Sequence, residues 1–455
     1  MGHFDLAIIG TGSGNSLVTP DFDDARVAVI ERGTFGGTCL NVGCIPTKML
    51  VYAAEVADTV STAARYGVDA TLDKVRWTDI RDRVFGRIDP IAEAGKDYRV
   101  NGPNTTVFLG DARFTGPREL TVTTGDVVTA DQVVIAAGGH PMVPDPVTRS
   151  RVPFHTSDTV MRIDALPERM AIIGGGYVAA EFAHIFGALG VKVSILARSP
   201  RLLRHLDSDL SSRFTALAER RWDVHLAADV VAARTTGRGV RLELKHGDPV
   251  ETDLLLVAIG REPNTRGLRL DAAGVETHDD GRVKVDEYGR TTAAGVWSLG
   301  DISSDYQLKH VANHEARVVA HNLAHPGDLW AFDHRFVPSA IFSNPQVATV
   351  GITEDQARER RLRHTAYIQS YGDTAYGWAR EDTTGICKVI ADPATGLLLG
   401  AHVMGYQASN LIQPLVQAMS FGQRVQDLAR GQYWIHPALM EVVENALLGL
   451  RLDDH

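Results

Sequence analysis

Two glycine clusters, each flanked by apolar runs, constrain the fold of this chain more than any other feature. The clusters occupy residues 10–14 and 174–176. The flanking apolar runs are residues 6–9 and 27–31 for the first cluster, and residues 170–173 and 191–196 for the second. A strand, a tight turn, a helix and a second strand form the unit of a parallel sheet. We therefore predict an α/β protein with two Rossmann-like dinucleotide-binding domains.

The first cluster has the pattern of a pyrophosphate-binding turn, because its glycines let the backbone approach a phosphate at a helix N-terminus. The candidate contacts are Gly10, Gly12, Ser13 and Gly14. Glu31 ends the second strand, where its carboxylate is placed to accept hydrogen bonds from a ribose hydroxyl. Asn15 replaces the third glycine of the fingerprint and Pro20 breaks the helix, so we expect a short helix with looser packing. An ordinary glycine turn is the alternative.

The second cluster is a cleaner match, because Ala179 fills the third position after Gly174 and Gly176. The strand that follows ends at Arg198 without an acidic residue. An acid at this point favours the free 2′-hydroxyl of NAD, whereas arginine favours the 2′-phosphate of NADP. Arg204, and with it Arg201, is close enough in sequence to join the same cluster. The alternative is that these arginines are solvated surface charge.

Each unit is followed by a further apolar strand that ends in glycine, at Gly138 and at Gly260. A duplicated nucleotide-binding architecture explains this repetition. The stretch between Gly138 and Met170 is punctuated by prolines, among them Pro141, Pro144, Pro146 and Pro153, which suits a linker. After about residue 334, strand-like and helix-like runs alternate without a glycine fingerprint, and this pattern predicts an α+β domain.

The spacing of Cys39 and Cys44 is the most specific chemical feature of the sequence. A zinc site needs further Cys or His ligands at characteristic spacings, and none stand nearby. A structural disulfide that closes so short a loop constrains the unfolded chain little. Residues five apart on a regular helix lie too far apart to bridge easily, so a bridge here requires a distorted turn. Such a bridge is reducible and suits a redox pair, while two incidental free thiols remain the alternative.

Residues 36–48, which contain both cysteines, closely resemble the redox-active segment of the pyridine-nucleotide disulfide oxidoreductases. This family includes glutathione reductase, lipoamide dehydrogenase and mercuric reductase, and the resemblance covers essentially the whole chain. Residues 291–301 resemble its second FAD motif, in which Asp301 would hold the ribityl chain. Residues 308–312 are similar to the start of the helix beneath the flavin. The resemblance implies FAD and NADPH as cofactors, and it adds Thr38, Gly138, Asp301 and His310 to the FAD contacts and Tyr177 and Gly260 to the NADPH contacts.

The resemblance also implies roles for the reactive side chains. Cys39 would attack the substrate disulfide, and Cys44 would lie beside the flavin as the charge-transfer thiolate. His436 would protonate the departing thiol. Pro437 can open a helix, which would leave His436 at its mouth with Glu441 about one turn further on, where the carboxylate orients the imidazole. In relatives this histidine serves the other subunit, which implies an obligate homodimer with shared active sites. A lone histidine before proline is more often structural.

Two further residues take roles from the resemblance. Lys48 would pair with Glu181 beside the flavin, and Tyr177 would gate the nicotinamide pocket. Plain packing or ion-pair roles are the alternatives for both.

The resemblance divides the chain into four expected parts. They are residues 1–143 (FAD-binding, with the redox disulfide), 144–263 (NADPH-binding), 264–333 (completing the FAD site) and 334–455 (dimerisation). The net charge of −10, from 46 basic and 56 acidic residues, argues against nucleic-acid binding through overall basicity. We expect no bound metal and no membrane span. Three cysteines are too few for a secreted disulfide framework, so a reducing cytoplasm is expected.

The remaining cysteine and several segments narrow the substrate to a small-molecule disulfide. Cys387 is isolated, so it is expected to pack in a core and to form no second dithiol. Residues 16–20 lack the arginine that glutathione reductases usually place there, and Ala197 replaces the acid of lipoamide dehydrogenases. Residues 10–16, 309–317, 405–409 and 431–436 resemble the branch of the family that reduces mycothione, the disulfide of mycothiol. A dihydrolipoamide dehydrogenase, another low-molecular-weight disulfide reductase, or a non-catalytic flavin-binding redox sensor are the alternatives.

Overall fold

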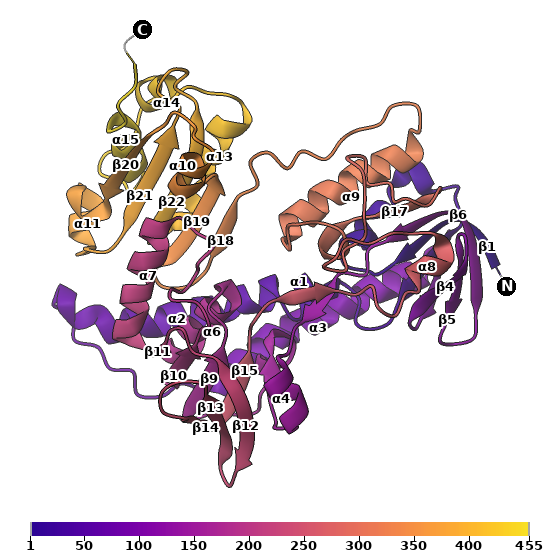
Figure 1. Cartoon of the computed structure of the whole chain (residues 1–455), viewed down its shortest axis with the longest axis horizontal. Helices are drawn as coiled ribbons and strands as arrows, with labels where there is room; N and C mark the ends of the chain where they lie inside the picture. The colour runs from indigo at the N-terminus through magenta and orange to yellow at the C-terminus, as the bar shows by residue number, and fades with distance from the viewer. Residues whose placement is uncertain (1, 454–455) are drawn as a thin grey trace.

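The N-terminal part of the molecule is built on a seven-stranded sheet (Figure 1). The computed structural model describes residues 2–453. The strands follow the order β3-β2-β1-β6-β5-β4, and β17 pairs with β6 as a branch. Their bounds are β1 Gly2–Ile9, β2 Val27–Glu31, β3 Thr105–Leu109, β4 Ala112–Gly116, β5 Glu119–Val122, β6 Val127–Ile135 and β17 Val296–Ser298. Strands β3, β2, β1, β6 and β17 are parallel, as the first glycine cluster predicts.

The helices around this sheet differ sharply in length. The first helix is short, as predicted: a five-residue 3₁₀ turn, η1 (Ser13–Leu17), is followed by η2, which begins at Pro20. The remaining elements are η2 Pro20–Phe22, α1 Gly37–Asn41, α2 Cys44–Thr62, η3 Ala63–Tyr66, α3 Trp77–Val100, α8 Leu270–Ala273, η4 Gly300–Ile302 and α9 Lys309–Ala324. Thus β17 and α9, from residues 264–333, belong to the N-terminal sheet and its covering layer.

The second glycine cluster opens a parallel sheet of order β11-β10-β9-β15-β8. Its strands are β8 His155–Thr156, β9 Arg169–Ile173, β10 Lys192–Leu196, β11 Asp223–His225 and β15 Leu254–Val257. An antiparallel sheet of β12 Val230–Thr236, β13 Gly239–Leu244 and β14 Val250–Thr252 lies beside it, and the helices are α6 Tyr177–Ala188 and α7 Ser208–Arg221.

The stretch between Gly138 and Met170, which the sequence predicts to be a linker, instead contains regular secondary structure. It contains β7 (Gly139–Pro141), α4 (Asp145–Ser150), β8 and α5 (Ser157–Val160). Strand β7 pairs with β16 (Arg261–Pro263), and β8 pairs with β15. Strand β8 thus joins the second sheet, whereas β7 forms a separate two-stranded sheet with β16.

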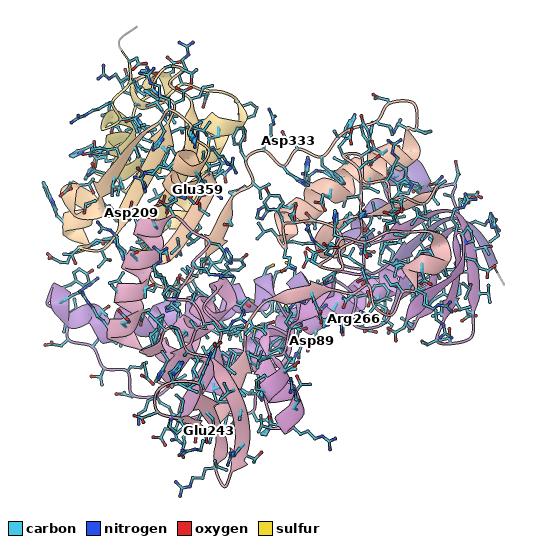
Figure 2. All side chains as sticks on the ribbon, viewed as in Figure 1. Asp89, Asp209, Glu243, Arg266, Asp333 and Glu359 are labelled. Carbon is cyan, nitrogen blue, oxygen red and sulfur yellow. The ribbon has the colours of Figure 1, made fainter. Side chains whose placement is uncertain are left out.

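The C-terminal part is an α+β unit, as its mixed pattern predicts. Its antiparallel sheet has the order β18-β19-β22-β21-β20. The elements are β18 Ser339–Ile341, β19 Gln346–Gly351, α10 Glu354–Glu359, β20 Thr365–Ser370, η5 Tyr371–Asp373, α11 Ala375–Ala379, β21 Ile386–Ala391, β22 Leu398–Gly405, α12 Ala408–Leu411, α13 Gln413–Ser420, α14 Val425–Arg430 and α15 Glu441–Leu448. Cys387 is fully buried in β21, as expected. A long segment that includes Asp333 connects α9 to this unit (Figure 2).

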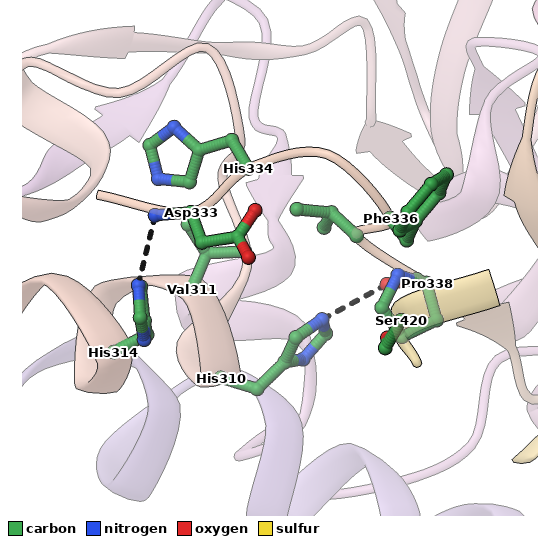
Figure 3. Close-up of a pocket in the computed structure, with 9 residues that line it drawn as sticks. His310, Val311, His314, Asp333, His334, Phe336, Pro338 and Ser420 are labelled. Atoms are coloured by element: carbon green, nitrogen blue, oxygen red, sulfur yellow. Dashed lines mark hydrogen bonds between the residues drawn. The ribbon is translucent and has the colours of Figure 1, made fainter. Parts of the chain in front are cut away.

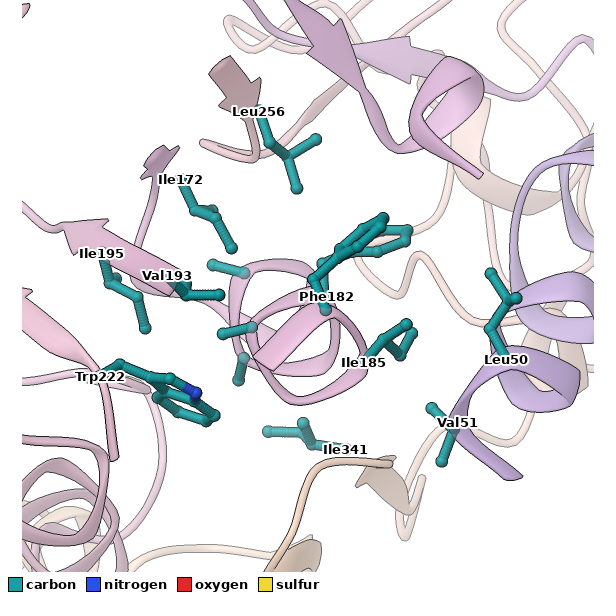
Figure 4. Close-up of a cluster of buried hydrophobic side chains, with 14 of the residues drawn as sticks. Leu50, Val51, Ile172, Phe182, Ile185, Val193, Ile195, Trp222, Leu256 and Ile341 are labelled. Atoms are coloured by element: carbon teal, nitrogen blue, oxygen red, sulfur yellow. The ribbon is translucent and has the colours of Figure 1, made fainter. Parts of the chain in front are cut away.

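The largest apolar core joins the redox segment to the second nucleotide-binding unit. Leu50 and Val51 of α2 face Phe182 and Ile185 of α6 across this core, and Ile172 of β9 lies on its other side (Figure 4). Burial of apolar side chains is the main stabilising contribution at such a contact. The packing therefore fixes the helix that begins at Cys44 against the helix that follows the second glycine cluster. No helix within residues 2–453 is both long and apolar enough to cross a membrane.

Candidate functional site

The first glycine turn has the backbone shape that a pyrophosphate requires. Gly10 has φ +102°, and a Cβ there would lie 2.4 Å from the carbonyl oxygen of Ala136. Thr11 donates from its backbone N–H and its hydroxyl to Oε2 of Glu31, at 2.9 and 2.7 Å. The other oxygen of Glu31 accepts from Gly33 N–H at 2.8 Å. Glu31 is thus held at the strand end with lone pairs left for a ribose, and these residues fit an adenine dinucleotide.

The expected flavin contacts lie on loops and helix starts around this turn. Asp301 lies in η4, and burial raises the pKa of its carboxyl. Helix α9 begins at Lys309, as predicted, and Lys309 Nζ donates to Ser13 Oγ at 2.9 Å. Thr38 Oγ1 accepts a hydrogen bond from Arg261 at 3.4 Å. The backbone oxygen of Gly138, which has φ +64°, accepts from Asn264 N–H at 3.0 Å.

His310 is part of a small cavity between α9 and the connecting segment (Figure 3). The cavity measures about 160 Å³ and is also lined by His314, Asp333 and His334. His310 Nε2 donates to the carbonyl oxygen of Pro338 at 2.9 Å, in the tautomer that protonates this nitrogen. The side chain therefore braces the start of α9 against the connecting segment. Within residues 2–453 no group of His, Cys, Asp and Glu side chains is arranged to hold a metal ion.

The second glycine turn repeats the geometry of the first. Gly174 has φ +141°, and a Cβ there would lie 2.2 Å from the carbonyl oxygen of Ala258. Gly176 is the N-cap of the twelve-residue helix α6, in which Ala179 is buried. Tyr177 opens this helix with 54% of its surface exposed, so its ring is free to cover a ligand. Gly260, with φ +133°, ends the loop after β15.

The arginines expected to read a 2′-phosphate lie after β10. Arg198 is exposed and, among the described residues, makes no hydrogen bond or ion pair. Among residues 2–453, the only hydrogen bond of Arg204 joins its Nε to the neighbouring His205, at 3.3 Å, and Arg201 donates to Ser212. Arg198 and Arg204 therefore offer guanidinium groups that are not paired with a carboxylate, and such groups suit a phosphate.

The two cysteines lie on either side of a break between α1 and α2. Val42 and Gly43 leave helical geometry, which is the distorted turn that bridging would require. Both thiols are free in this structure. A hydrogen bond from the Cys44 thiol lowers the pKa of Cys39 to about 7 against the opposing effect of burial, and the Lys309 ammonium adds to the lowering. The same hydrogen bond raises the pKa of Cys44 far above its ordinary value, so the reduced pair holds its proton on Cys44, which differs from the thiolate expected there.

Lys48 and Glu181 are brought near each other without forming a direct ion pair, which differs from the expected contact. Lys48 Nζ lies 4.0 Å from Glu55 and 4.3 Å from the ring centre of Phe342. Glu181 accepts from Phe342 N–H at 2.8 Å. Burial raises the pKa of Glu181 to about 7, although this hydrogen bond and the charge of Lys48 partly oppose the rise. Phe342 therefore occupies the space between the two expected partners.

His436 and Glu441 form the expected contact, with a different local structure. Nδ1 of His436 lies 2.7 Å from Oε1 of Glu441. Helix α15 begins at Glu441, so Pro437 lies in the turn before the helix and does not open it as predicted. The imidazole is largely exposed, and among residues 2–453 its only hydrogen-bond partner is Glu441. Tyr433 and Ile435, just before it, are also strongly exposed.

Arg261 is a site residue that the sequence reading did not identify. Its guanidinium donates to Gly139 O at 2.6 Å and to Asp158 at 3.1 Å, and it reaches Thr38 beside Cys39. The side chain thereby joins the redox segment to both nucleotide-binding units. The position directly after Gly260 at the end of a glycine-terminated strand was the only signal for it in the sequence.

Comparisons with known proteins agree with this geometry. Residues 4–316 match the model of the pyridine nucleotide-disulphide oxidoreductases, and residues 337–447 match the dimerisation domain of the same family. Mycothione reductase of Mycobacterium tuberculosis is 56% identical over 461 residues, covering 99% of this chain and 100% of the relative. Glutathione reductase of Burkholderia cepacia is 34% identical, covering 96% and 97%. Among solved structures, the flavoprotein disulfide reductase RclA from Escherichia coli superposes with a TM-score of 0.88 at 27% identity, covering 98% of this chain and 99% of that one.

Proposed function

Because this chain belongs to the pyridine nucleotide-disulphide oxidoreductase family, we propose that it uses NADPH and FAD to reduce mycothione to mycothiol. The observation that carries the reaction type is the Cys39–Cys44 pair, in which one thiol is acidified by the other. The substrate rests on the likeness to mycothione reductase over nearly the whole length of both chains.

NADPH is favoured over NADH by the charge at the end of β10. Arg198 and Arg204 are exposed there, and no carboxylate occupies the position that would bind the free 2′-hydroxyl of NADH. FAD is favoured at the first glycine turn, because Glu31 is oriented for a ribose and the turn lies close to the redox segment through Gly12 and Gly37. A Cβ on Gly37 would lie 2.6 Å from Cα of Gly12.

The reaction begins with Cys39, whose lowered pKa leaves a reactive fraction of thiolate at neutral pH. The thiolate attacks one sulfur of mycothione, forms a mixed disulfide with Cys39 and releases one mycothiol. Cys44 then passes its proton to His436, which gave up its own in the first step. The Cys44 sulfur attacks the Cys39 sulfur, releases the second mycothiol and closes the Cys39–Cys44 disulfide. Bound FAD would supply the two-electron transfer from NADPH to this disulfide, which restores the dithiol.

His436 provides the proton for the departing thiolates. Glu441 holds the imidazole by its Nδ1, which leaves Nε2 free to donate to the departing sulfur. His436 has no contact with the cysteines within its own chain, and the exposed Tyr433 and Ile435 beside it suit burial against another subunit. We infer a homodimer in which His436 and Glu441 of one subunit complete the site of the other.

A dihydrolipoamide dehydrogenase is the second candidate, since one from Corynebacterium glutamicum is 32% identical to this chain. Arg198 argues against it, because such an enzyme would use NAD. A redox sensor without turnover would need neither the acidified Cys39 nor the His436–Glu441 pair. The reducing cytoplasm remains the compartment that fits a dithiol enzyme with so few cysteines.

Trapping the mixed disulfide tests the proposal. C44S leaves Cys39 to attack mycothione and removes the thiol that resolves the product. Mass spectrometry of C44S after incubation with mycothione is expected to find one mycothiol on Cys39, and C39S is expected to carry none. Equal labelling of both variants, or labelling of neither, would overturn the assigned chemistry.

A further inference from the structure

The first glycine turn lacks the long helix that usually assists a pyrophosphate. The dipole of a helix places partial positive charge at its N-terminus, where phosphates bind. Here η1 is a five-residue 3₁₀ turn that ends at Leu17, whereas α6 after the second glycine cluster has twelve residues. The first turn therefore has much less dipolar charge to offer a diphosphate than the second.

A buried arginine reaches this turn from a distant helix. Arg99, close to the end of α3, donates from Nε to Oδ1 of Asn15 at 2.7 Å and from Nη2 to the backbone oxygen of Asn15 at 2.6 Å. Asn15 directly follows Gly14 and occupies the position of the missing third glycine. Both acceptors are thus within one residue of the glycine turn.

The charge of Arg99 is not neutralised by the protein. Arg99 is only 8% exposed, and among residues 2–453 no carboxylate lies within ion-pair distance of it. Burial lowers the pKa of its guanidinium, and the neighbouring Tyr98 opposes this effect only in part. A buried cation without a counter-charge is costly unless an anion completes its surroundings. A second cation, Lys309, contacts the same turn at Ser13.

We propose that Arg99 supplies the positive charge for the diphosphate of FAD that the short first helix does not provide. Asn15 holds the guanidinium against the turn in place of the third glycine. This inference rests on the assignment of the first glycine turn to FAD, and it gives a role to the one residue that departs from the fingerprint.

Binding to the full-length apoprotein tests the inference without turnover. FAD is titrated by flavin fluorescence, and ADP, which carries the diphosphate without the flavin, by calorimetry. R99Q is expected to raise the Kd for both ligands by about 10–100-fold, since a hydrogen bond to a charged group contributes about 1.5–3 kcal/mol. The dependence of the FAD Kd on salt concentration becomes shallower in R99Q. The matched control R87Q, on the exposed face of α3, leaves both Kd values unchanged.

The thermal stability of each apoprotein separates binding from folding. A lower Tm of R99Q with unchanged Kd values would make Arg99 a structural residue and overturn the inference. Should R99Q fail to fold, R99K decides, because a lysine cannot make both bonds to Asn15. R99K is expected to raise the Kd for ADP by about threefold or more, and an unchanged Kd overturns the inference. A wild-type apoprotein that does not bind FAD would instead overturn the assignment of the turn itself.

Discussion

Lys388 of the C-terminal sheet places its ammonium 2.8 Å from the carboxylate of Asp207 at the N-cap of α7, and both side chains are almost completely buried. Asp209 and Glu354 lie 2.6 and 2.8 Å from the same ammonium. One cation and three carboxylates thus join the second nucleotide-binding unit to the C-terminal unit. The His436–Glu441 pair belongs to the C-terminal unit. This contact therefore fixes the position of the pair relative to the second nucleotide-binding unit.

Removal of this cation is expected to destabilise the joined units strongly. K388M leaves the buried carboxylate of Asp207 without its counter-charge and lowers the free energy of unfolding by about 3–5 kcal/mol at pH 7, as measured by urea denaturation. K192M is the control, since Lys192 and Glu168 form an exposed pair and its loss changes stability by less than about 0.5 kcal/mol. Equal midpoints for K388M and wild type would contradict the role of the cluster.

The pH dependence of this contact follows from Asp207. Burial alone would raise the pKa of its carboxyl, but hydrogen bonds from Lys388 and from Glu354 N–H outweigh burial and lower it. A carboxyl with a lowered folded-state pKa stabilises the protein above its unfolded pKa of about 3.9 and loses that contribution as pH falls through the folded value. The stability difference between wild type and K388M is therefore expected to shrink below about pH 4. A difference that stays constant down to pH 3 would contradict this reading.

The reactivity of the two cysteines is expected to differ with pH. Cys39 has a pKa of about 7, whereas the thiol of Cys44 stays protonated. In the reduced protein, the alkylation rate at Cys39 should reach half its maximum near pH 7, followed by peptide mass spectrometry after iodoacetamide. C44A removes the hydrogen bond that lowers the pKa, so the midpoint at Cys39 shifts upward. Faster alkylation of Cys44 than of Cys39 would reverse the assigned roles.

The His436–Glu441 pair is expected to act on substrate thiols and not on folding. H436N should lower kcat with mycothione by about 100-fold or more, since a general acid–base group contributes about 10²–10⁴-fold. E441Q, which keeps a hydrogen-bond acceptor but loses the charge, should lower kcat less than H436N does. H246A, at an exposed position in the second unit, is the control. A kcat of E441Q equal to that of wild type would remove Glu441 from the mechanism.

Nucleotide preference is expected to depend on Arg198. R198A should raise the KM for NADPH by about 10–100-fold, because a charge-assisted hydrogen bond to phosphate is lost. The kcat/KM with NADH should stay the same, since NADH has no 2′-phosphate. R238A, at an exposed arginine in the turn between β12 and β13, controls for a general loss of positive charge. A parallel loss with both nucleotides would show that Arg198 does not select the phosphate.

Local patterns predicted the two parallel sheets, the short first helix, the break at the cysteines and the start of α9. Each of these depends on a few neighbouring residues, such as Gly10 with its positive φ or Pro20 at the second 3₁₀ turn. The start of α15 at Glu441 was missed, because a proline at a helix opening and a proline in a preceding turn look alike in a sequence.

Long-range contacts could not be predicted from one sequence. Arg99 and Asn15 are 84 residues apart, and Lys388 and Asp207 are 181 apart. A long charged side chain is usually exposed, so nothing in its neighbours marks it as buried. The insertion of Phe342 between Lys48 and Glu181 likewise depends on how the C-terminal unit packs on α6.

Steady-state turnover with three disulfides tests whether mycothione and NADPH are the preferred substrates. Mycothione, glutathione disulfide and lipoamide are each offered to the FAD-loaded protein with NADPH and with NADH. We expect the highest kcat/KM for mycothione with NADPH. The preference for NADPH over NADH should be about tenfold or more, a factor that corresponds to roughly 1.4 kcal/mol. Turnover of lipoamide with NADH in preference to mycothione with NADPH would contradict this expectation.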